Sequence, residues 1–191
     1  PYQTFFEDFD NDGLVDILVT ANLEASLYKN TSSNLNSPTP SISFDKIGSF
    51  LLSETLQQEQ SLQTFRSAAI GDLNDDGFPD IYAEYKNGKN RLFLNSKNSN
   101  NFLKVKLLGT TSNLDCIGAK LELSHSSFGT QVREIRAGES YGIVNSFIQT
   151  FGIGQLSTNS GLSLKIIWPD GSIQNISNAN LTIRKLNTFQ E

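Results

Sequence analysis

Polar and apolar residues alternate along much of the second half of the chain. Apolar side chains occupy every second position in residues 103–107, 119–123 and 162–168. A period of two is typical of a β-strand that buries one face. Residues 169–171 (Pro-Asp-Gly) predict a tight hairpin turn, and Gly152 and Gly154 predict a bend or bulge. The pattern therefore predicts an all-β sandwich or barrel-like module.

Two further positions in this half have a structural interpretation. Trp168 ends an alternating stretch and is interpreted as a core residue rather than as a sugar-stacking platform. Arg133, Glu134 and Arg136 leave both faces of their strand partly polar. This favours an exposed edge strand, with an anion contact at the two arginines as the alternative.

The first half of the chain contains an internal repeat. Residues 8–16 (DFDNDGLVD) align with residues 72–80 (DLNDDGFPD) at an offset of 64 positions. Each acidic loop is followed by a β-branched or aromatic run, Ile17–Val19 or Ile81–Ala83, which predicts a strand. The likeness extends to Asn30 and Asn95, so a whole supersecondary unit is repeated. Residues 53–63 are polar and glutamine-rich and predict a short surface helix or a loop.

Both loops share the pattern D-x-[DN]-x-D-G-x-x-D. Side-chain oxygens at positions 1, 3, 5 and 9 and a carbonyl at position 7 can surround one hard cation such as Ca²⁺. Gly13 and Gly77 stand at position 6, where the chain must turn sharply. Position 12 is Val19 or Ala83 where an EF-hand needs glutamate, so the loops are not EF-hands. The alternative is a plain polar turn, since Asp, Asn and Gly are common turn residues.

With these flanks, the two loops resemble FG-GAP/VCBS repeats, the blades of integrin-α-like β-propellers. The resemblance implies Ca²⁺ at two sites, with Asp75 facing solvent. Because Asn74 replaces an aspartate, we expect the second site to bind calcium more weakly. The implied ligands are Asp8, Asp10, Asp12, Leu14 (carbonyl) and Asp16 in the first site, and Asp72, Asn74, Asp76, Phe78 (carbonyl) and Asp80 in the second.

The second half resembles the ASPIC/UnbV domain, which commonly follows FG-GAP/VCBS repeats, as in the cartilage acidic protein family and its bacterial relatives. Four ordered motifs carry this resemblance: residues 113–119, residues 133–138 with Tyr141, residues 151–154 and residues 168–171. Cys116 stands where that family usually has a small residue, which implies packing rather than a reactive thiol. The expected fold is all-β, with partial-propeller blades in residues 1–100 and a β-sandwich-like ASPIC/UnbV domain in residues 101–191.

Composition narrows the classes of partner. The 191 residues carry a formal net charge of −5 and a pI near 4.9, which disfavours nucleic acid. No apolar run reaches the roughly 20 residues of a membrane helix. Cys116 is the single cysteine and His125 the single histidine, so neither an internal disulfide nor a cysteine-based zinc site is expected. The chain has no methionine and is expected to be a segment of a longer precursor, with more blades and a secretion signal upstream.

These observations predict a non-catalytic, calcium-binding interaction or adhesion module outside the cell or on its surface, or in the periplasm or on the outer surface of a bacterium. Extracellular calcium modules bind at about 10⁻⁴ to 10⁻³ M, a range that fits this location. The expected partner is a protein or a glycan, besides the rest of the propeller. The alternative is an accessory region of a secreted polysaccharide-active enzyme whose catalytic part lies upstream.

Overall fold

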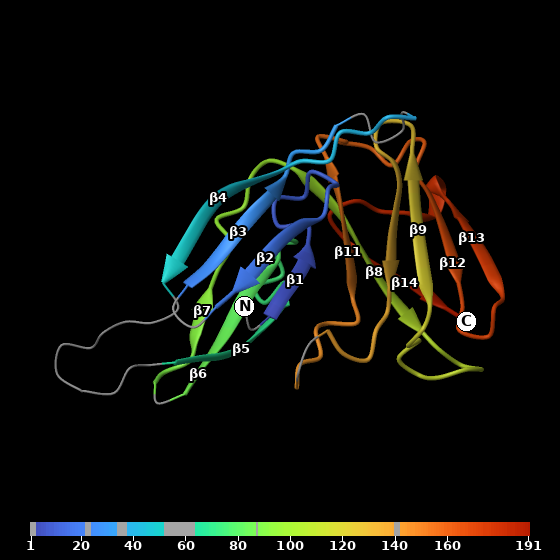
Figure 1. The fold of residues 1–191 in the computed structure, drawn as a ribbon. Helices are drawn as coiled ribbons and strands as arrows, with labels where there is room; N and C mark the ends of the chain where they lie inside the picture. The colour runs from blue at the N-terminus through green and yellow to red at the C-terminus, as the bar shows by residue number, and fades with distance from the viewer. Residues whose placement is uncertain (1–2, 22–23, 34–37, 52–63, 87, 140–141) are drawn as a thin grey trace. The chain divides into compact units, whose positions relative to one another are not determined.

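The fold consists of β-strands and one short 3₁₀ turn in the part of the chain that is described (Figure 1). The computed structural model describes residues 3–21, 24–33, 38–51, 64–86, 88–139 and 142–191. The predicted all-β class is confirmed. In chain order the elements are β1 (Gln3–Glu7), β2 (Asp16–Thr20), β3 (Glu24–Asn30), β4 (Phe44–Leu51), β5 (Thr64–Gly71), β6 (Asp80–Lys86), β7 (Arg91–Phe93), β8 (Asn101–Leu108), β9 (Lys120–His125), β10 (Gly129–Glu134), β11 (Gln149–Gly154), β12 (Ser163–Ile167), β13 (Ile173–Ser177), η1 (Asn178–Asn180) and β14 (Leu186–Gln190).

The chain forms two compact units, and each includes a short segment whose neighbours in sequence belong to the other unit. The first unit comprises Pro1–Phe9, Leu14–Ser96 and Gly138–Asn145. The second comprises Asp10–Gly13, Lys97–Ala137 and Ser146–Glu191. Each unit thus contains a piece of chain that lies between two stretches of the other.

The first unit is built from two antiparallel sheets. One has the strand order β1-β2-β3-β4 and the other the order β5-β6-β7. A four-stranded antiparallel sheet with strands in chain order is the form of a propeller blade. Facing apolar side chains from both sheets form one core, in which Leu18 and Ala83 are fully buried and Phe65 stacks edge-on against Tyr85 at 6.2 Å between ring centres.

Residues 138–145 complete this unit although they come from the second half of the sequence. Ile143 is 8% exposed and belongs to the core of the first unit. The side-chain oxygen of Asn145 accepts a hydrogen bond from the Ile70 amide at 3.0 Å, and that of Gln3 accepts one from the Ala68 amide at 2.9 Å. Both amides belong to the edge strand β5. The two side chains therefore satisfy edge groups that would otherwise be open to pairing with another strand.

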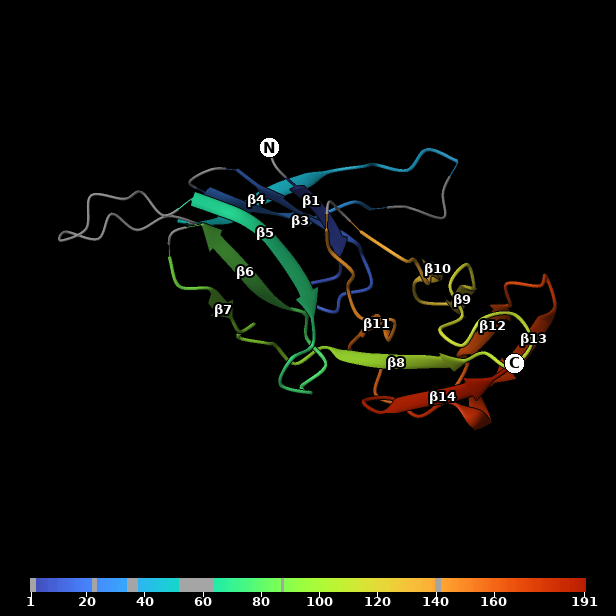
Figure 2. The same cartoon turned by 90° about the horizontal axis from the view of Figure 1, so that it is seen from below.

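The second unit is a two-sheet structure (Figure 2). The order of the first sheet is β10-β9-β12-β13, and the order of the second is β11-β8-β14, where β14 runs parallel to β8. Leu121, Leu164 and Leu103 are fully or almost fully buried in one core drawn from both sheets. Trp168, 4% exposed, and Cys116, 0% exposed, lie in the same core, as predicted.

Most strand predictions for this unit are confirmed. The turn at residues 169–171 joins β12 to β13, with Gly171 at φ 89°. The β11–β8 register shifts between Gly152 and Gly154, which is the predicted bulge. β10, which carries Arg133 and Glu134, is an edge strand, as predicted. Arg136 was predicted on the same strand but lies beyond its end at Glu134. Residues 53–63 lie outside the described part of the chain.

One prediction from the alternating pattern is wrong. Lys104 is placed on the polar face by its pattern, yet it is 7% exposed and lies in a run of buried residues, 101–105. The reason is that β8 is the central strand of its sheet, between β11 and β14. Both faces of a central strand can be covered, and the long aliphatic part of lysine packs well against apolar neighbours.

Candidate metal centre

The first acidic loop connects β1 to β2, and the register of these strands fixes where its ends lie. Glu7 pairs with Asp16, so Asp8, one residue beyond β1, starts close to Asp16, the first residue of β2. Within the loop, the Asp10 carboxylate accepts a hydrogen bond from the Asp12 amide at 3.2 Å. This contact turns the chain back on itself, so that a side chain from the loop tip can approach the strand ends.

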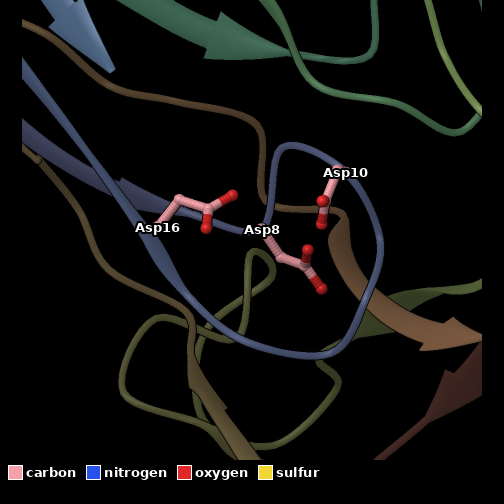
Figure 3. Close-up of side chains that lie close together, drawn as sticks. All are labelled: Asp8, Asp10 and Asp16. Atoms are coloured by element: carbon pink, nitrogen blue, oxygen red, sulfur yellow. The ribbon is translucent and has the colours of Figure 1, made fainter. Parts of the chain in front are cut away.

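Three carboxylates gather at this loop (Figure 3). One oxygen from each of Asp8, Asp10 and Asp16 lies within 4.8 Å of the others. Asp8 is 1% exposed and Asp16 is 2% exposed, whereas Asp10 is partly exposed. In the described residues this is the one group of three acidic, histidine or cysteine side chains that meets the geometry of a metal site.

The donor set fits a hard divalent cation. Two oxygens bound to one Ca²⁺ at about 2.4 Å lie at most about 4.8 Å apart, which matches the spacing of this group. Buried carboxylates that converge without a cation repel each other, and that repulsion is stronger in a protein interior than in water. Asp8, Asp10 and Asp16 are therefore the residues that would hold the ion. Asp12 and Leu14 follow in the same loop, partly exposed and outside the group of three.

Gly13 meets two separate demands at position 6 of the loop. Its φ of 94° lies in the region that favours glycine. A Cβ built there would lie 3.1 Å from Nε2 of Gln131 and 3.3 Å from the carbonyl oxygen of Gly152. A side chain at this position would thus strain the backbone and press on its neighbours. Gly77, its counterpart in the second loop, has φ 88°.

Asp16 also holds the loop to the rest of its sheet. Its two carboxylate oxygens accept hydrogen bonds from the Phe9 amide at 3.1 Å and the Asn30 amide at 2.8 Å. The Asn30 side chain in turn donates to the Val15 carbonyl at 2.9 Å. Because Asn30 ends β3, this aspartate links the loop to the third strand of the sheet. Hydrogen bonds to an ionised carboxylate are the strong ones.

The same arrangement recurs in the second repeat. Asp80, 0% exposed, accepts from the Leu73 amide at 2.9 Å and from the Asn95 amide at 2.8 Å. The Asn95 side chain donates to the Pro79 carbonyl at 3.2 Å and also to the Phe9 carbonyl at 2.8 Å. The aspartate at position 9 is therefore a conformational anchor in both loops, whether or not it binds a metal.

The other polar side chains of the second loop bond mainly to groups of the same loop. The Asp72 carboxylate accepts from the amides of Asp76 at 3.0 Å and Gly77 at 2.8 Å. The Asp76 carboxylate accepts from the Asn74 side chain and from the Phe78 amide, both at 3.0 Å. These carboxylates accept hydrogen bonds from loop amides, and within the described residues they do not form a group of three with the geometry of a metal site. The second calcium site, and its weaker affinity, stay predictions.

The tip of the first loop is also held by residues distant in sequence. The side-chain amides of Asn98 and Asn100 both donate to the Asp10 carbonyl oxygen, each at 2.8 Å. The Gly154 amide donates to the Asn11 carbonyl at 2.9 Å. These contacts fix the main chain of Asp10 and so the direction of its carboxylate. Apart from a high asparagine content nearby, no local pattern marks Asn98 or Asn100 as partners of the loop.

A cavity of about 260 Å³ lies in the first unit beside β5 and β6. Its lining includes Ser67, Glu84, Tyr82 and Asn90. The Ser67 hydroxyl donates to Glu84 at 2.9 Å, and the Asn90 amide donates to the Tyr82 hydroxyl at 2.8 Å. The polar side chains of the lining thus bond to one another in pairs, and the described lining residues include no histidine or lysine.

His125 and Cys116, the single histidine and the single cysteine, both have surroundings that indicate a structural role. The His125 ring contacts the Ser127 hydroxyl at 2.7 Å and accepts from the Ser127 amide at 3.1 Å, which closes a local turn. Burial raises the pKa of the Cys116 thiol, and the negative charges of Glu191 and Asp115 add to this effect. A buried thiol with a raised pKa is a poor nucleophile.

Comparison with known protein families gives a match in each half of the chain. Residues 8–83 match the profile of the FG-GAP-like repeat, and residues 109–189 match that of the ASPIC and UnbV domain. Domains of these two types usually occur in extracellular or cell-surface proteins. No curated protein matches the chain. In the described residues, no helix has the length and apolar character needed to cross a bilayer.

Proposed function

Because the chain carries an FG-GAP-like repeat followed by an ASPIC and UnbV domain, we propose that it is a non-catalytic, calcium-binding interaction module that works outside the cell or at its surface. The two domain types are compatible with extracellular interaction modules. The convergence of Asp8, Asp10 and Asp16 at one loop is the observation that carries the calcium assignment.

Asp8 and Asp16 would supply buried carboxylate oxygens, and Asp10 a third from the loop tip. Asp12 and the Leu14 carbonyl complete the proposed set, which matches the six to eight oxygens that calcium takes once water is included. A bound Ca²⁺ would neutralise the charge gathered here. These residues would hold the ion within the loop, and the hydrogen bonds that Asp16 accepts from the Phe9 and Asn30 amides would keep the strand ends in place.

The second loop is proposed to hold a second Ca²⁺ through Asp72, Asn74, Asp76, Phe78 (carbonyl) and Asp80. To do so, the Asp72 and Asp76 side chains must exchange loop amides for the ion. Breaking hydrogen bonds to charged groups costs about 1.5–3 kcal/mol each. This supports the proposal that the second loop binds calcium more weakly than the first.

Such a module would recognise a protein or a glycan, and calcium would set the rigidity of the surface that does so. A ligand that binds the folded chain alone stabilises it by linkage. Extracellular calcium modules typically bind at about 10⁻⁴ to 10⁻³ M, so their sites are filled outside the cell and empty in most cytosols. Rigid loops lose less entropy on binding a partner, which is how metal occupancy would support adhesion.

The proposal is tested by isothermal titration calorimetry with CaCl₂ on the 191-residue chain after treatment with a chelator. We expect calcium binding that is weakened in Asp8→Asn and a melting temperature that rises with calcium. The matched control is Asp75→Asn, which removes one charge from an exposed loop position that faces solvent in the proposed arrangement. Absence of calcium binding, with the same melting temperature in calcium and in chelator, would reject the calcium assignment.

A further inference from the structure

Three consecutive backbone amides in the loop after β8 point at one carboxylate. The amides of Thr110, Thr111 and Ser112 donate to a single oxygen of Glu191 at 3.0, 2.7 and 3.0 Å. The Ser112 hydroxyl donates to the other oxygen at 2.8 Å. Successive N–H groups that converge in this way form an anion-binding concavity, often called a nest. Backbone nests of this kind capture carboxylates in peptide recognition.

The loop that forms this nest is held in shape by contacts that do not involve Glu191. The Gly109 amide donates to the Leu114 carbonyl at 3.2 Å. The Asn113 side chain donates to the Ile117 carbonyl at 3.0 Å and accepts from the Ile117 amide at 2.8 Å. A Cβ on Gly109 would lie 1.9 Å from the Asn113 carbonyl oxygen, so the turn is closed too tightly for any other residue. The nest is therefore preformed.

Glu191 lies at the nest because it directly follows β14, which runs beside β8 up to the start of the loop. Gln190 pairs with Leu108 at the end of the parallel β14–β8 ladder, and the Glu191 amide donates to the Leu108 carbonyl at 3.0 Å. β14 is an edge strand whose one strand partner is β8. The carboxylate thus behaves as a ligand tethered to a strand end, and residues 110–112 are otherwise exposed.

We propose that residues 110–112 are a carboxylate-binding site, which Glu191 fills as an internal ligand and which the carboxylate of an acidic peptide fills when Glu191 is withdrawn. The donors match both oxygens of a carboxylate, since three backbone amides donate to one oxygen and the Ser112 hydroxyl donates to the other. Neither the calcium loops nor the proposed function depends on this site. Displacement of Glu191 would release the end of β14 and free an edge of β8 for pairing with the incoming chain.

The experiment is an NMR titration of the 191-residue chain and its Glu191→Ala variant with sodium acetate, with sodium chloride at the same ionic strength as reference. In Glu191→Ala, we expect saturable acetate-dependent shifts at the amides of Thr110, Thr111 and Ser112. In the unsubstituted chain, the same shifts should need about tenfold more acetate or more, because the tethered carboxylate competes at a high effective concentration. Gln190→Ala, which keeps Glu191, is the matched control and should behave like the unsubstituted chain.

Several outcomes would overturn the proposal. Equal shifts with chloride would show a non-specific salt effect, and no saturable shift in Glu191→Ala would show that the nest does not bind a carboxylate. Loss of the dispersed amide signals of residues 110–112 in Glu191→Ala would show that the nest is not preformed, which also contradicts the proposal. A second variant, Ser112→Ala in the Glu191→Ala background, should weaken acetate binding while leaving the amide signals in place.

Discussion

Asp10→Asn should change the stability of the protein in opposite directions with and without calcium. One oxygen of Asp10 lies within 4.8 Å of an oxygen of Asp8 and of Asp16. At an effective dielectric constant of about 20, two unit charges at that distance repel by about 3 kcal/mol, and the partial exposure of Asp10 reduces this value. We therefore expect Asp10→Asn to raise the free energy of unfolding by about 1 kcal/mol in chelator. Asparagine keeps the oxygen that accepts the Asp12 amide, so the turn survives.

In calcium the order of stabilities should reverse. Calcium at about a hundredfold above its dissociation constant stabilises the unsubstituted chain by about 2.7 kcal/mol. Removing one ligand charge should weaken calcium binding by about tenfold or more, since ligand charge sets the affinity of such sites. At the same calcium concentration, calcium therefore stabilises the variant by at most about 1.4 kcal/mol. That is at least about 1.3 kcal/mol less than it stabilises the unsubstituted chain. This loss outweighs the electrostatic advantage of about 1 kcal/mol, so Asp10→Asn should be less stable than the unsubstituted chain in calcium.

The assay is urea unfolding followed by circular dichroism, in chelator and in calcium. Hydrogen exchange of the β2 amides gives a local measure next to the loop. Asp75→Asn should differ from the unsubstituted chain by less than about 0.5 kcal/mol under both conditions. If Asp10→Asn were destabilised in chelator, or if calcium stabilised it as much as the unsubstituted chain, the reasoning about converging charges would be refuted.

Four further outcomes are expected. Replacing Asn98 and Asn100 together by alanine should weaken calcium binding by calorimetry about fivefold or more while changing the chelator melting temperature little, because ordering one backbone residue costs about 1–2 kcal/mol. Asp80→Asn should lower the free energy of unfolding in chelator by about 2–3 kcal/mol in urea titrations, since its amide nitrogen must face a buried N–H donor. Leu121→Ala should cost about 2–5 kcal/mol, measured by Trp fluorescence, which reports the second unit. The backbone hydrogen bonds of the nest lower the pKa of Glu191 to about 2, so its ¹³C carboxyl shift should titrate near that pH, and its stabilising contact should be present at neutral pH and lost as pH falls through that value.

Local patterns in the sequence determine much of the fold. Alternation predicted the strands around Leu121 and Leu164, and glycine chemistry predicted the turn at Gly171 and the bulge at Gly154. These features depend on a few neighbouring residues, so the sequence window that encodes them is short. The acidic repeat likewise predicted two loops between strands, and the structure places both where the pattern expects them.

Features that depend on distant partners were not predictable in this way. Asn98 and Asn100 contact the first loop across about ninety residues of chain, and no local pattern marks them. The burial of Lys104 depends on β8 having neighbours on both sides. The two loops share one pattern, yet only the first gathers three carboxylates in the described residues, because side-chain direction depends on which amides compete for each carboxylate.

The segment Gly138–Asn145 has a consequence for how the protein is made. During synthesis the chain emerges from its N-terminus, and domains generally fold as units once their sequence is available. The first unit needs Ile143 for its core and Asn145 for the edge of β5. Its sheets can therefore form early but cannot be completed until more than forty residues of the second unit have already emerged. Completion of the first unit is therefore coupled to synthesis of the second, although each has a core of its own.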